Sequence, residues 1–447
     1  MNSPNREVTV LIGCMFGCTA VSWLRYYQVG TLRIDDVPLP TIQKLWPPFA
    51  FGVLAAIMAW RFFELYRHPG TLRDMALGAI ALHLSAASAL PLTSNDLFSN
   101  LAYGHLAAMG YNPYLTSPRT LAPSDAFAAL VGRRWLNTPV VYGPIVTGLC
   151  AVVGRCQRVW SAMLLWKATM LAIDLATLSI AYRVCRDQLG GERSAKSFVL
   201  FAFSPVLVWE IVGQAHNDGV LVLAMVGFVW AAYRGRQWLA VLCLTGALYA
   251  KLAALAILIL YLALIFRGHR TRAIAMALLV AAIGVVAMRP YWHGIASMDG
   301  PISTFGGQVS RTSRSFADLA VGAAVPFGEG AQTMVYRVFW LGGVGWLVLF
   351  LARAAIQVRT VQAVMHHGSV VFCVYCLVAA PWFQPWYVTW LLPLALAHHD
   401  SRWQQNAALY AALTPVQYFL QADPITTIVI NIVVIRKFVA MRKMGNR

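Results

Sequence analysis

The stretch SFVLFAFSPVLVWEIVGQAHNDGVLVLAMVGFVWAAY, residues 197–233, places two apolar runs on either side of a short polar junction. Apolar runs approaching about 20 residues are expected to cross a membrane as helices. Asn217 or Asp218 could cap the second helix. However, a junction that also holds Gln214 and His216 carries more polarity at a membrane edge than a cap needs. The stretch therefore predicts two membrane helices joined at a polar site.

The whole chain has the composition of a membrane protein. Of its 447 residues 59% are hydrophobic and 12% are charged, whereas charged residues make up about 25% of soluble domains. Apolar runs recur from end to end without a long polar domain, so we predict an all-α fold, a polytopic transmembrane helix bundle forming a single domain over residues 1–447. The bundle should have about 13–14 spans, which we place at residues 8–29, 47–66, 74–92, 159–183, 197–213, 217–233, 237–250, 252–266, 272–289, 331–352, 364–381, 385–397, 404–420 and 424–439.

The basic residues indicate how these spans are oriented. The net charge is +18, but most Lys and Arg residues flank apolar runs, which is the positive-inside pattern and argues against nucleic-acid binding. The basic clusters lie at residues 61–73, 183–196, 234–237, 267–272, 352–359, 398–402 and 436–447. Placing them in the cytoplasm puts both termini there as well. The first apolar run is long enough to be a retained span rather than a cleaved signal peptide.

One segment decides whether this alternation holds. VVYGPIVTGLCAVVGR, residues 140–155, is apolar enough to span, but it contains Gly143, Pro144, Gly148 and Gly154. If it crossed the membrane, the basic 183–196 loop would lie outside. We therefore expect a helix in the outer interface.

That interpretation leaves two large outer loops, a candidate catalytic loop at about residues 93–158 and a second at about 290–330. The basic residues alone determine this topology, and it places many polar and aromatic side chains on the outer side. We therefore expect these side chains to share an outer cavity. The side chains proposed to bind substrate are Tyr103, His105, Tyr111, Asn112, Tyr142, Gln214, His216, Asn217, Asp218, Gln384, Trp386 and Tyr387.

Asp96 is the candidate catalytic residue. It follows an apolar run in the sequence SND at residues 94–96. It could simply cap the helix that starts near Leu97. Alternatively, a carboxylate at a membrane-edge cavity would be partly desolvated, gain basicity, and serve as a general base.

Three cations are candidates for phosphate binding. Lys251 interrupts an apolar run, and Arg311 and Arg314 would share a helical face in the second outer loop. Arginine suits bidentate recognition of phosphate. The simpler alternatives are a lysine that snorkels to the interface and arginines that pair with anionic lipid heads.

Each aromatic or polar motif also has a structural alternative. GYNPYL at residues 110–115 has the composition of a turn. The Trp-rich PWFQPWYVTW at residues 381–390 fits an aromatic belt, although Trp and Tyr beside Gln384 would also stack on a sugar.

Other common chemistries have no sequence support. The sequence has no GxxxxGK[ST] or HExxH motif, and the absence of the first argues against an ATP-driven pump. The eight cysteines have no zinc spacing, and we expect buried thiols.

The order of the motifs resembles the GT-C membrane glycosyltransferases, most of all the polyprenol-phosphate-mannose-dependent α-mannosyltransferases of bacteria. The motifs are Asp96 after an early span, YGHLAAMGYNPY (103–114), VYGP (141–144), GQAHNDG (213–219), GALYAKL (246–252) and QPWYVTWLLPLA (384–395). The family often has Tyr after the acid, whereas here Leu97 and Phe98 follow Asp96. This difference affects the expected substrate contacts and does not affect the assignment of Asp96 as the base.

The resemblance implies an inverting transfer of a hexose, mannose in this family, from a polyprenyl-phosphate donor to a glycan or glycolipid acceptor. Asp96 would be the general base, at the outer face of a bacterial inner or plasma membrane. No cofactor is expected, and without an adjacent acid pair at the site no metal is expected either. The alternatives are a flippase or transporter and an O-antigen-type polymerase or ligase. A transporter should have internal repeats and polar groups at mid-membrane, and a polymerase or ligase should depend on Arg and His in a large outer loop.

Overall fold

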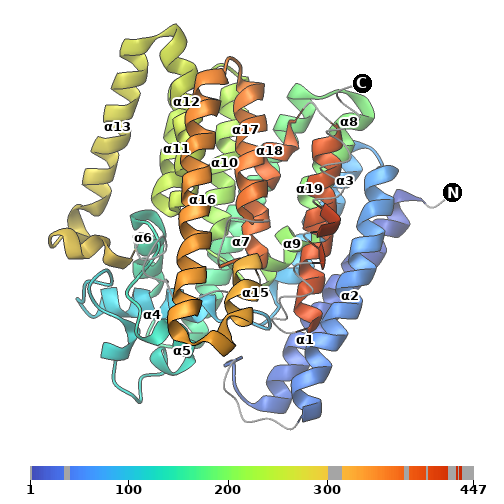
Figure 1. The fold of residues 1–447 in the computed structure, drawn as a ribbon. Helices are drawn as coiled ribbons and strands as arrows, with labels where there is room; N and C mark the ends of the chain where they lie inside the picture. Colours follow the sequence, from blue (N-terminus) through green and yellow to red (C-terminus); the bar gives the residue numbers. More distant parts are fainter. Residues whose placement is uncertain are drawn as a thin grey trace.

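The computed structural model describes residues 3–34, 41–300, 315–376, 382–398, 401–420, 429–430 and 432–434. Throughout these ranges the regular secondary structure is helical and no β-strand occurs. The predicted all-α polytopic bundle is therefore confirmed (Figure 1).

Six described helical stretches are long and apolar enough to cross a membrane: Pro4–Val29, Lys44–Arg67, Val159–Gln188, Gly191–Gly213, Arg270–Tyr291 and Glu329–Gln357. They correspond to α1 (Pro4–Val29), α2 (Thr41–Arg67), α7 (Val159–Gln188), the run from α8 to η3 (Gly191–Gly213), α13 (Arg270–Met288) with its following turn, and α16 (Glu329–Gln357). Shorter apolar helices are α6 (Pro144–Val153), α10 (Asp218–Tyr233), α11 (Gln237–Ala250), α12 (Leu255–Gly268) and α17 (Val361–Val374).

The remaining larger elements are α3 (Leu72–Ala87), α4 (Asp96–Ala108), α5 (Arg133–Leu136), α15 (Phe316–Ala323), α19 (Ser401–Leu413) and η10 (Thr414–Leu420). The last two occupy the span expected at residues 404–420. The span expected at 424–439 lies mostly outside the described residues.

The predicted basic loops that belong to the described residues gather at one end of the bundle (Figure 1). Three contacts join them in pairs: Arg234 with Asp187, Arg272 with Gln237, and Arg267 with the carbonyl of Ala355. Arg61 pairs with Glu7 at the start of α1. At the opposite end lie α4, α5, α6 and α15 (Figure 1). This grouping matches the alternation expected from the positive charges. Which end faces the cytoplasm remains a prediction.

Two expected spans are broken rather than continuous. The run at 197–213 forms α8 (Gly191–Ala202), α9 (Pro205–Leu207) and a π-helical turn, η3 (Val208–Gly213), because a proline inside a helix removes a hydrogen bond and crowds the preceding turn. The stretch 385–397 forms the 3-10 helix η9 (Pro385–Trp390) and α18 (Leu392–Leu396), with prolines at 385 and 393. The irregular turn η3 in the first run carries Glu210, and Gln384 is the N-cap of η9 in the second.

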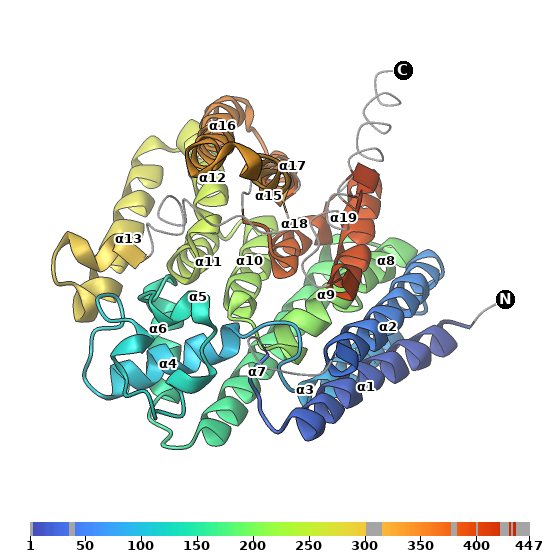
Figure 2. The same cartoon turned by 60° about the horizontal axis from the view of Figure 1, so that its bottom comes forward.

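The segment at 140–155 is too short to span. Its helix, α6, has 10 residues, about 15 Å at 1.5 Å per residue, against a hydrocarbon core of about 30 Å. It packs on α4 instead, and the two helices lie side by side to the left of α7 in Figure 2. This arrangement agrees with the expected interfacial helix.

Glycines allow α4 and α6 to approach so closely. A Cβ atom on Gly154, the C-cap of α6, would lie 1.9 Å from the carbonyl carbon of Gly104, whereas a Cβ atom on Gly148, inside α6, would meet nothing within 4 Å. Backbone atoms cannot yield as a flexible side chain can, so the helices would have to separate.

We therefore expect Gly154→Ala to lower the midpoint of thermal unfolding in detergent and Gly148→Ala to leave it unchanged. Overpacking of this kind costs about 1–3 kcal/mol. Equal melting of the two variants would contradict the close packing of α4 on α6.

Candidate active site

Asp96 opens α4 at the end of the bundle opposite the basic loops. The N-cap of α4 is Asn95, and its side chain makes no capping hydrogen bond to the helix. The backbone N–H of Asp96 donates to Ser94 Oγ at 3.2 Å, while its carboxylate lies beside His216 and is 15% exposed. Asp96 is therefore the first residue of the helix rather than its cap, and its carboxylate is directed at the GQAHND junction.

His216 lies between two carboxylates. Its Nδ1 is 3.7 Å from Asp96 Oδ2, and its Nε2 is 3.3 Å from Glu210 Oε2. The ring is buried and stacks on Trp386 with centroids 3.9 Å apart. One imidazole thus connects the acid at the head of α4 to an acid inside the bundle.

The backbone of the junction explains how Glu210 and His216 meet. The π-helical turn η3 ends with the Gln214 N–H donating to the Trp209 carbonyl at 2.7 Å, and the His216 N–H donates to the Glu210 carbonyl at 3.0 Å. Ala215 takes a φ of 55°, a left-handed conformation that costs a non-glycine residue about 1–3 kcal/mol. π-helical turns and strained residues often mark functional sites.

Lys167 stabilises this irregular backbone. Its Nζ donates to the carbonyls of Val212 and Gly213 at 3.2 and 2.7 Å, two groups that the end of η3 would otherwise leave without partners. Trp166 adds a hydrogen bond to the Ala215 carbonyl at 2.8 Å. Two neighbouring residues of α7 therefore fix the turn that carries His216.

A second ion pair lies beside the first. Asp218 begins α10 and is buried, and Lys251 Nζ contacts its Oδ2 at 2.6 Å. Trp390 Nε1 donates to the other oxygen, Oδ1, at 2.6 Å. Lys251 itself has extended backbone geometry between α11 and η4 (Leu252–Ala254), so the break in the apolar run brings its ammonium group to Asp218.

The VYGP motif brings Tyr142 to this pair. The Gly143 N–H donates to the Ala250 carbonyl at 3.0 Å, and a Cβ atom on Gly143 would lie 2.0 Å from the Tyr249 carbonyl oxygen. The Lys251 ammonium lies 5.4 Å from the centre of the Tyr142 ring, within range of a cation–π contact.

Burial and charge act in opposite directions on the two titratable groups at the junction. Burial raises the pKa of Asp96, and the charges of His216 and Lys251 reduce that rise without cancelling it. Burial alone would lower the pKa of His216, but Glu210 and Asp96 outweigh it, so that the pKa lies above its ordinary value. The geometry thus favours a protonated His216 beside a carboxylate of enhanced basicity.

Two predicted residues connect the junction to neighbouring backbone. Gln214 Oε1 accepts hydrogen bonds from the N–H groups of Leu92 and Thr93 at 2.8 and 3.0 Å, and Asn217 Nδ2 donates to Asn100 Oδ1 at 3.0 Å. They position the segment before α4 and α4 itself.

The other predicted side chains fall into two groups. Trp386, Tyr387 and Gln384 belong to or cap η9 at the site, where Tyr387 stacks on Trp390 at 4.3 Å. In the first outer loop three of the predicted side chains make their contacts elsewhere, and a fourth is exposed. Tyr103 donates to the Thr138 carbonyl, His105 pairs with Asp125 at 3.3 Å, Asn112 donates to the Tyr291 carbonyl, and Tyr111 is 43% exposed.

Arg311 and Arg314 lie outside the described residues. Within the described ranges no group of three His, Cys, Asp or Glu side chains has the arrangement of a metal site.

Sequence reasoning missed Glu210, Asn100 and Trp390. Glu210 had a detectable signal, since it is the only acid in the apolar run at 197–213. Trp390 had none, because an indole in an aromatic belt does not indicate that it will bind an acid 172 residues away.

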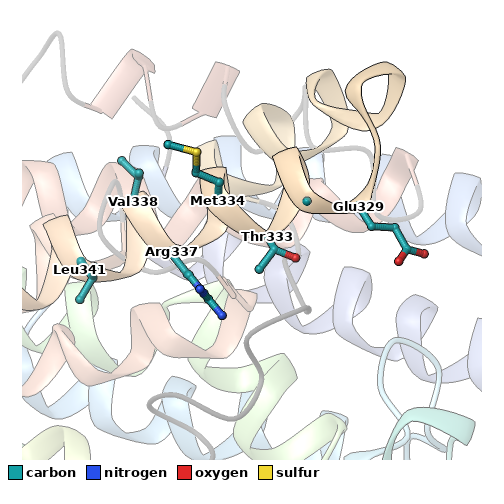
Figure 3. A pocket seen from close by; sticks show the side chains of 7 residues that line it. Glu329, Thr333, Met334, Arg337, Val338 and Leu341 are labelled. Atoms are coloured by element: carbon teal, nitrogen blue, oxygen red, sulfur yellow. The ribbon is translucent and has the colours of Figure 1, made fainter.

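A hollow of about 530 Å³ lies on the surface of α16, away from this cluster. Glu329, Thr333, Arg337 and Leu341 follow one another at a spacing of four residues along it (Figure 3). Helix α16 packs mainly on α15 and α12, so the hollow is a separate feature from the Asp96 cluster.

Comparison with known proteins gives the same family as the motifs. A family model described as "Alpha-(1->6)-mannopyranosyltransferase, N-terminal domain" matches residues 13–268. Alpha-(1->6)-mannopyranosyltransferase B of Corynebacterium glutamicum is 28% identical over 136 residues, which cover 30% of this chain and 22% of that protein. A "Probable alpha-(1->6)-mannopyranosyltransferase" of Mycolicibacterium smegmatis is 26% identical over 273 residues, covering 58% and 44%. The chain thus spans less than half the length of these two relatives.

A third relative aligns over most of both chains. Alpha-(1->6)-mannopyranosyltransferase A of Mycobacterium tuberculosis is 23% identical over 429 residues, covering 86% of this chain and 79% of that protein. The range that the family model matches contains Asp96, the GQAHND junction and Lys251, and the resemblance inferred from the motifs is confirmed. The chain therefore belongs to the alpha-(1->6)-mannopyranosyltransferase family.

Proposed function

We propose that this protein transfers a mannosyl group from a polyprenyl-phosphate donor to a hydroxyl of a glycan or glycolipid acceptor, with inversion at the anomeric carbon. The family and the names of the relatives support mannosyl transfer. The observation that carries the mechanism is the partly exposed Asp96 carboxylate beside a buried His216. A base must reach solvent or substrate, and a buried cation behind it keeps it ionised.

In the proposed reaction Asp96 accepts the proton of the acceptor hydroxyl. The oxygen attacks the anomeric carbon as the bond from that carbon to the phosphate oxygen breaks, and the lipid phosphate leaves with the bonding electron pair. The leaving phosphate is already a stable anion, so protonating it is not essential. Cations near it would stabilise the charge that develops in the transition state.

Lys251, Arg311 and Arg314 are the proposed phosphate contacts. Lys251 supports this role by its position, since its side chain is 14% exposed and lies in the same cluster as Asp96. It already neutralises Asp218, so it would act as half of an ion pair rather than as a free cation. The two arginines remain proposals from the sequence.

The sugar-binding proposal rests on the side chains nearest Asp96. Trp386 and Tyr387 offer aromatic surface, Tyr142 lies over Lys251, and Gln384 caps η9. Gln214, Asn217 and Asp218 support the cluster from within through the hydrogen bonds and the ion pair described above. The role of Tyr103, His105, Tyr111 and Asn112 in substrate binding remains a proposal from the sequence.

We further propose that the end carrying α4 and α6 faces the outside of a bacterial inner or plasma membrane, with both termini in the cytoplasm. The gathering of basic loops at the opposite end supports this orientation. No metal is assigned to the reaction.

The direct test is incubation of the purified protein with a panel of polyprenyl-phosphate sugars and a mannan-type acceptor, followed by mass analysis. We expect hexose transfer from the mannose donor, and retained activity in EDTA. Transfer from none of the donors would refute the function. A loss of activity in EDTA that only a divalent ion restores would refute the metal-independent mechanism.

A further inference from the structure

We propose that Glu210 is a positioning residue that holds His216 as an imidazolium against Asp96, so that a buried acid controls when the catalytic base is ionised. This inference rests on the proposed function of Asp96. It assigns a role to a residue that is not among the predicted site residues and that has no evident route to substrate, because Glu210 is fully buried.

The geometry leaves His216 little freedom. Each ring nitrogen faces a carboxylate, Asp96 at 3.7 Å and Glu210 at 3.3 Å, and the ring stacks on Trp386. A neutral imidazole can offer only one N–H, whereas a protonated one offers two. Two facing acids therefore match the charged form.

Glu210 in turn depends on His216. Both carboxylate oxygens of Glu210 are buried without a hydrogen-bond partner among the described residues, and the ion pair with His216 is the contact that they make. An uncompensated carboxylate in such a place is strongly unfavourable. Lys167 forms no ion pair with Glu210 within the described residues, and its ammonium group donates to the carbonyls of Val212 and Gly213 instead.

The neighbouring charges also favour the protonated form of His216. From α10 Asp218 adds a third carboxylate, and from the break after α11 Lys251 adds a cation. The phenols of Tyr142 and Tyr387 also face Asp96 and Asp218. With His216 protonated, three carboxylates face two cations, and without its proton they face Lys251 alone.

Removing the charge of Glu210 should therefore act on Asp96 through His216. The imidazolium would lose its proton at a lower pH, and its opposition to the raised pKa of Asp96 would disappear. Asp96 would then remain protonated, and inactive as a base, up to a higher pH. An opposite charge within about 4–6 Å lowers the pKa of a carboxyl group by about 1–3. When His216 loses its proton, Asp96 should lose part of this lowering, and its pKa should rise.

The experiment compares Glu210→Gln with Glu7→Gln, which removes another buried acid, one that pairs with Arg61 at the far end of the bundle. We expect the acidic limb of kcat/KM to move up by about 1 pH unit in Glu210→Gln, with the KM of the donor little changed, and to stay in place in Glu7→Gln. His216→Gln should move the limb similarly, and the double variant should move it no further. An unmoved limb in Glu210→Gln would overturn the proposal.

A second readout does not depend on turnover. A hydrophobic carbodiimide reacts with protonated carboxyl groups, so the pH midpoint of Asp96 labelling, followed by peptide mass analysis, reports its ionisation directly. We expect a higher midpoint in Glu210→Gln even if the natural substrate differs from the one proposed, and equal midpoints would refute the relay. If Glu210→Gln does not fold, Glu210→Asp replaces it. Its carboxylate is one methylene farther from His216, so the midpoint should rise in part, and an unmoved midpoint would refute the relay.

Discussion

Asp96→Asn should lower kcat for mannosyl transfer by about 10²–10⁴-fold, the contribution usual for a general base. Asparagine has nearly the same shape and keeps an oxygen toward His216, so the N-terminus of α4 and the junction should remain intact. The variant removes the proton acceptor and leaves the packing. Single-turnover transfer from a synthetic polyprenyl-phosphate mannose would measure the loss, because it separates chemistry from product release.

Two further variants make this result specific. Asp74→Asn changes an exposed acid in the first turn of α3, and it should leave transfer unchanged. Asp96→Glu keeps a carboxylate but moves it by one methylene, so we expect partial activity. Near-normal turnover by Asp96→Asn, in protein that melts like the wild type, would exclude Asp96 as the base.

The dependence of mannosyl transfer on pH should also reflect the ionisation of Asp96. Burial raises the pKa of Asp96, so the base is ionised above that raised value and protonated below it. Activity of the wild type should therefore fall as the pH drops through a midpoint above that of an ordinary carboxyl group. The residual activity of Asp96→Asn should lack this limb.

The regular helices were the part of the fold that the sequence predicted best, because apolar runs indicate the membrane spans and basic flanking residues indicate their orientation. The short segment at 140–155 was also predictable, since its glycines and its length argue against a span. The π-helical turn at Val208–Gly213 was not, because a shift from i→i−4 to i→i−5 bonding leaves no period in the hydrophobic pattern.

The candidate site, like the fold, was predictable from the sequence only in part. Four residues were expected together on the outer face of the membrane, and the structure brings them into one cluster: Asp96, His216, Asp218 and Lys251. His105 was expected with them, but it lies about 13 Å farther along α4 at 1.5 Å per residue and pairs with Asp125. Sequence order shows which end of a bundle a residue occupies, but it does not show how far along a helix the site extends or which side of the helix faces it.

Lys251→Met should be among the most destabilising single changes in the described part of the chain. It would leave Asp218, a buried carboxylate, with the Trp390 indole as a neutral donor. Removing one partner of a buried ion pair costs about 3–5 kcal/mol, because the remaining charge is uncompensated. We expect a large fall in the thermal midpoint in detergent, whereas Lys196→Met, which breaks an exposed pair with Glu192, should change the midpoint little.

The double variant Lys251→Met with Asp218→Asn separates the two roles of Lys251. Removing both charges leaves no buried ion unpaired, so most of the lost stability should return. If Lys251 only neutralises Asp218, the stable double variant should bind the lipid donor normally. If its ammonium also contacts the donor phosphate, the KM of the donor should remain raised while the KM of the acceptor is unchanged. We expect the second result, since the side chain of Lys251 keeps 14% of its surface exposed and that of Asp218 only 1%. The lysine, unlike its partner, can still reach a ligand.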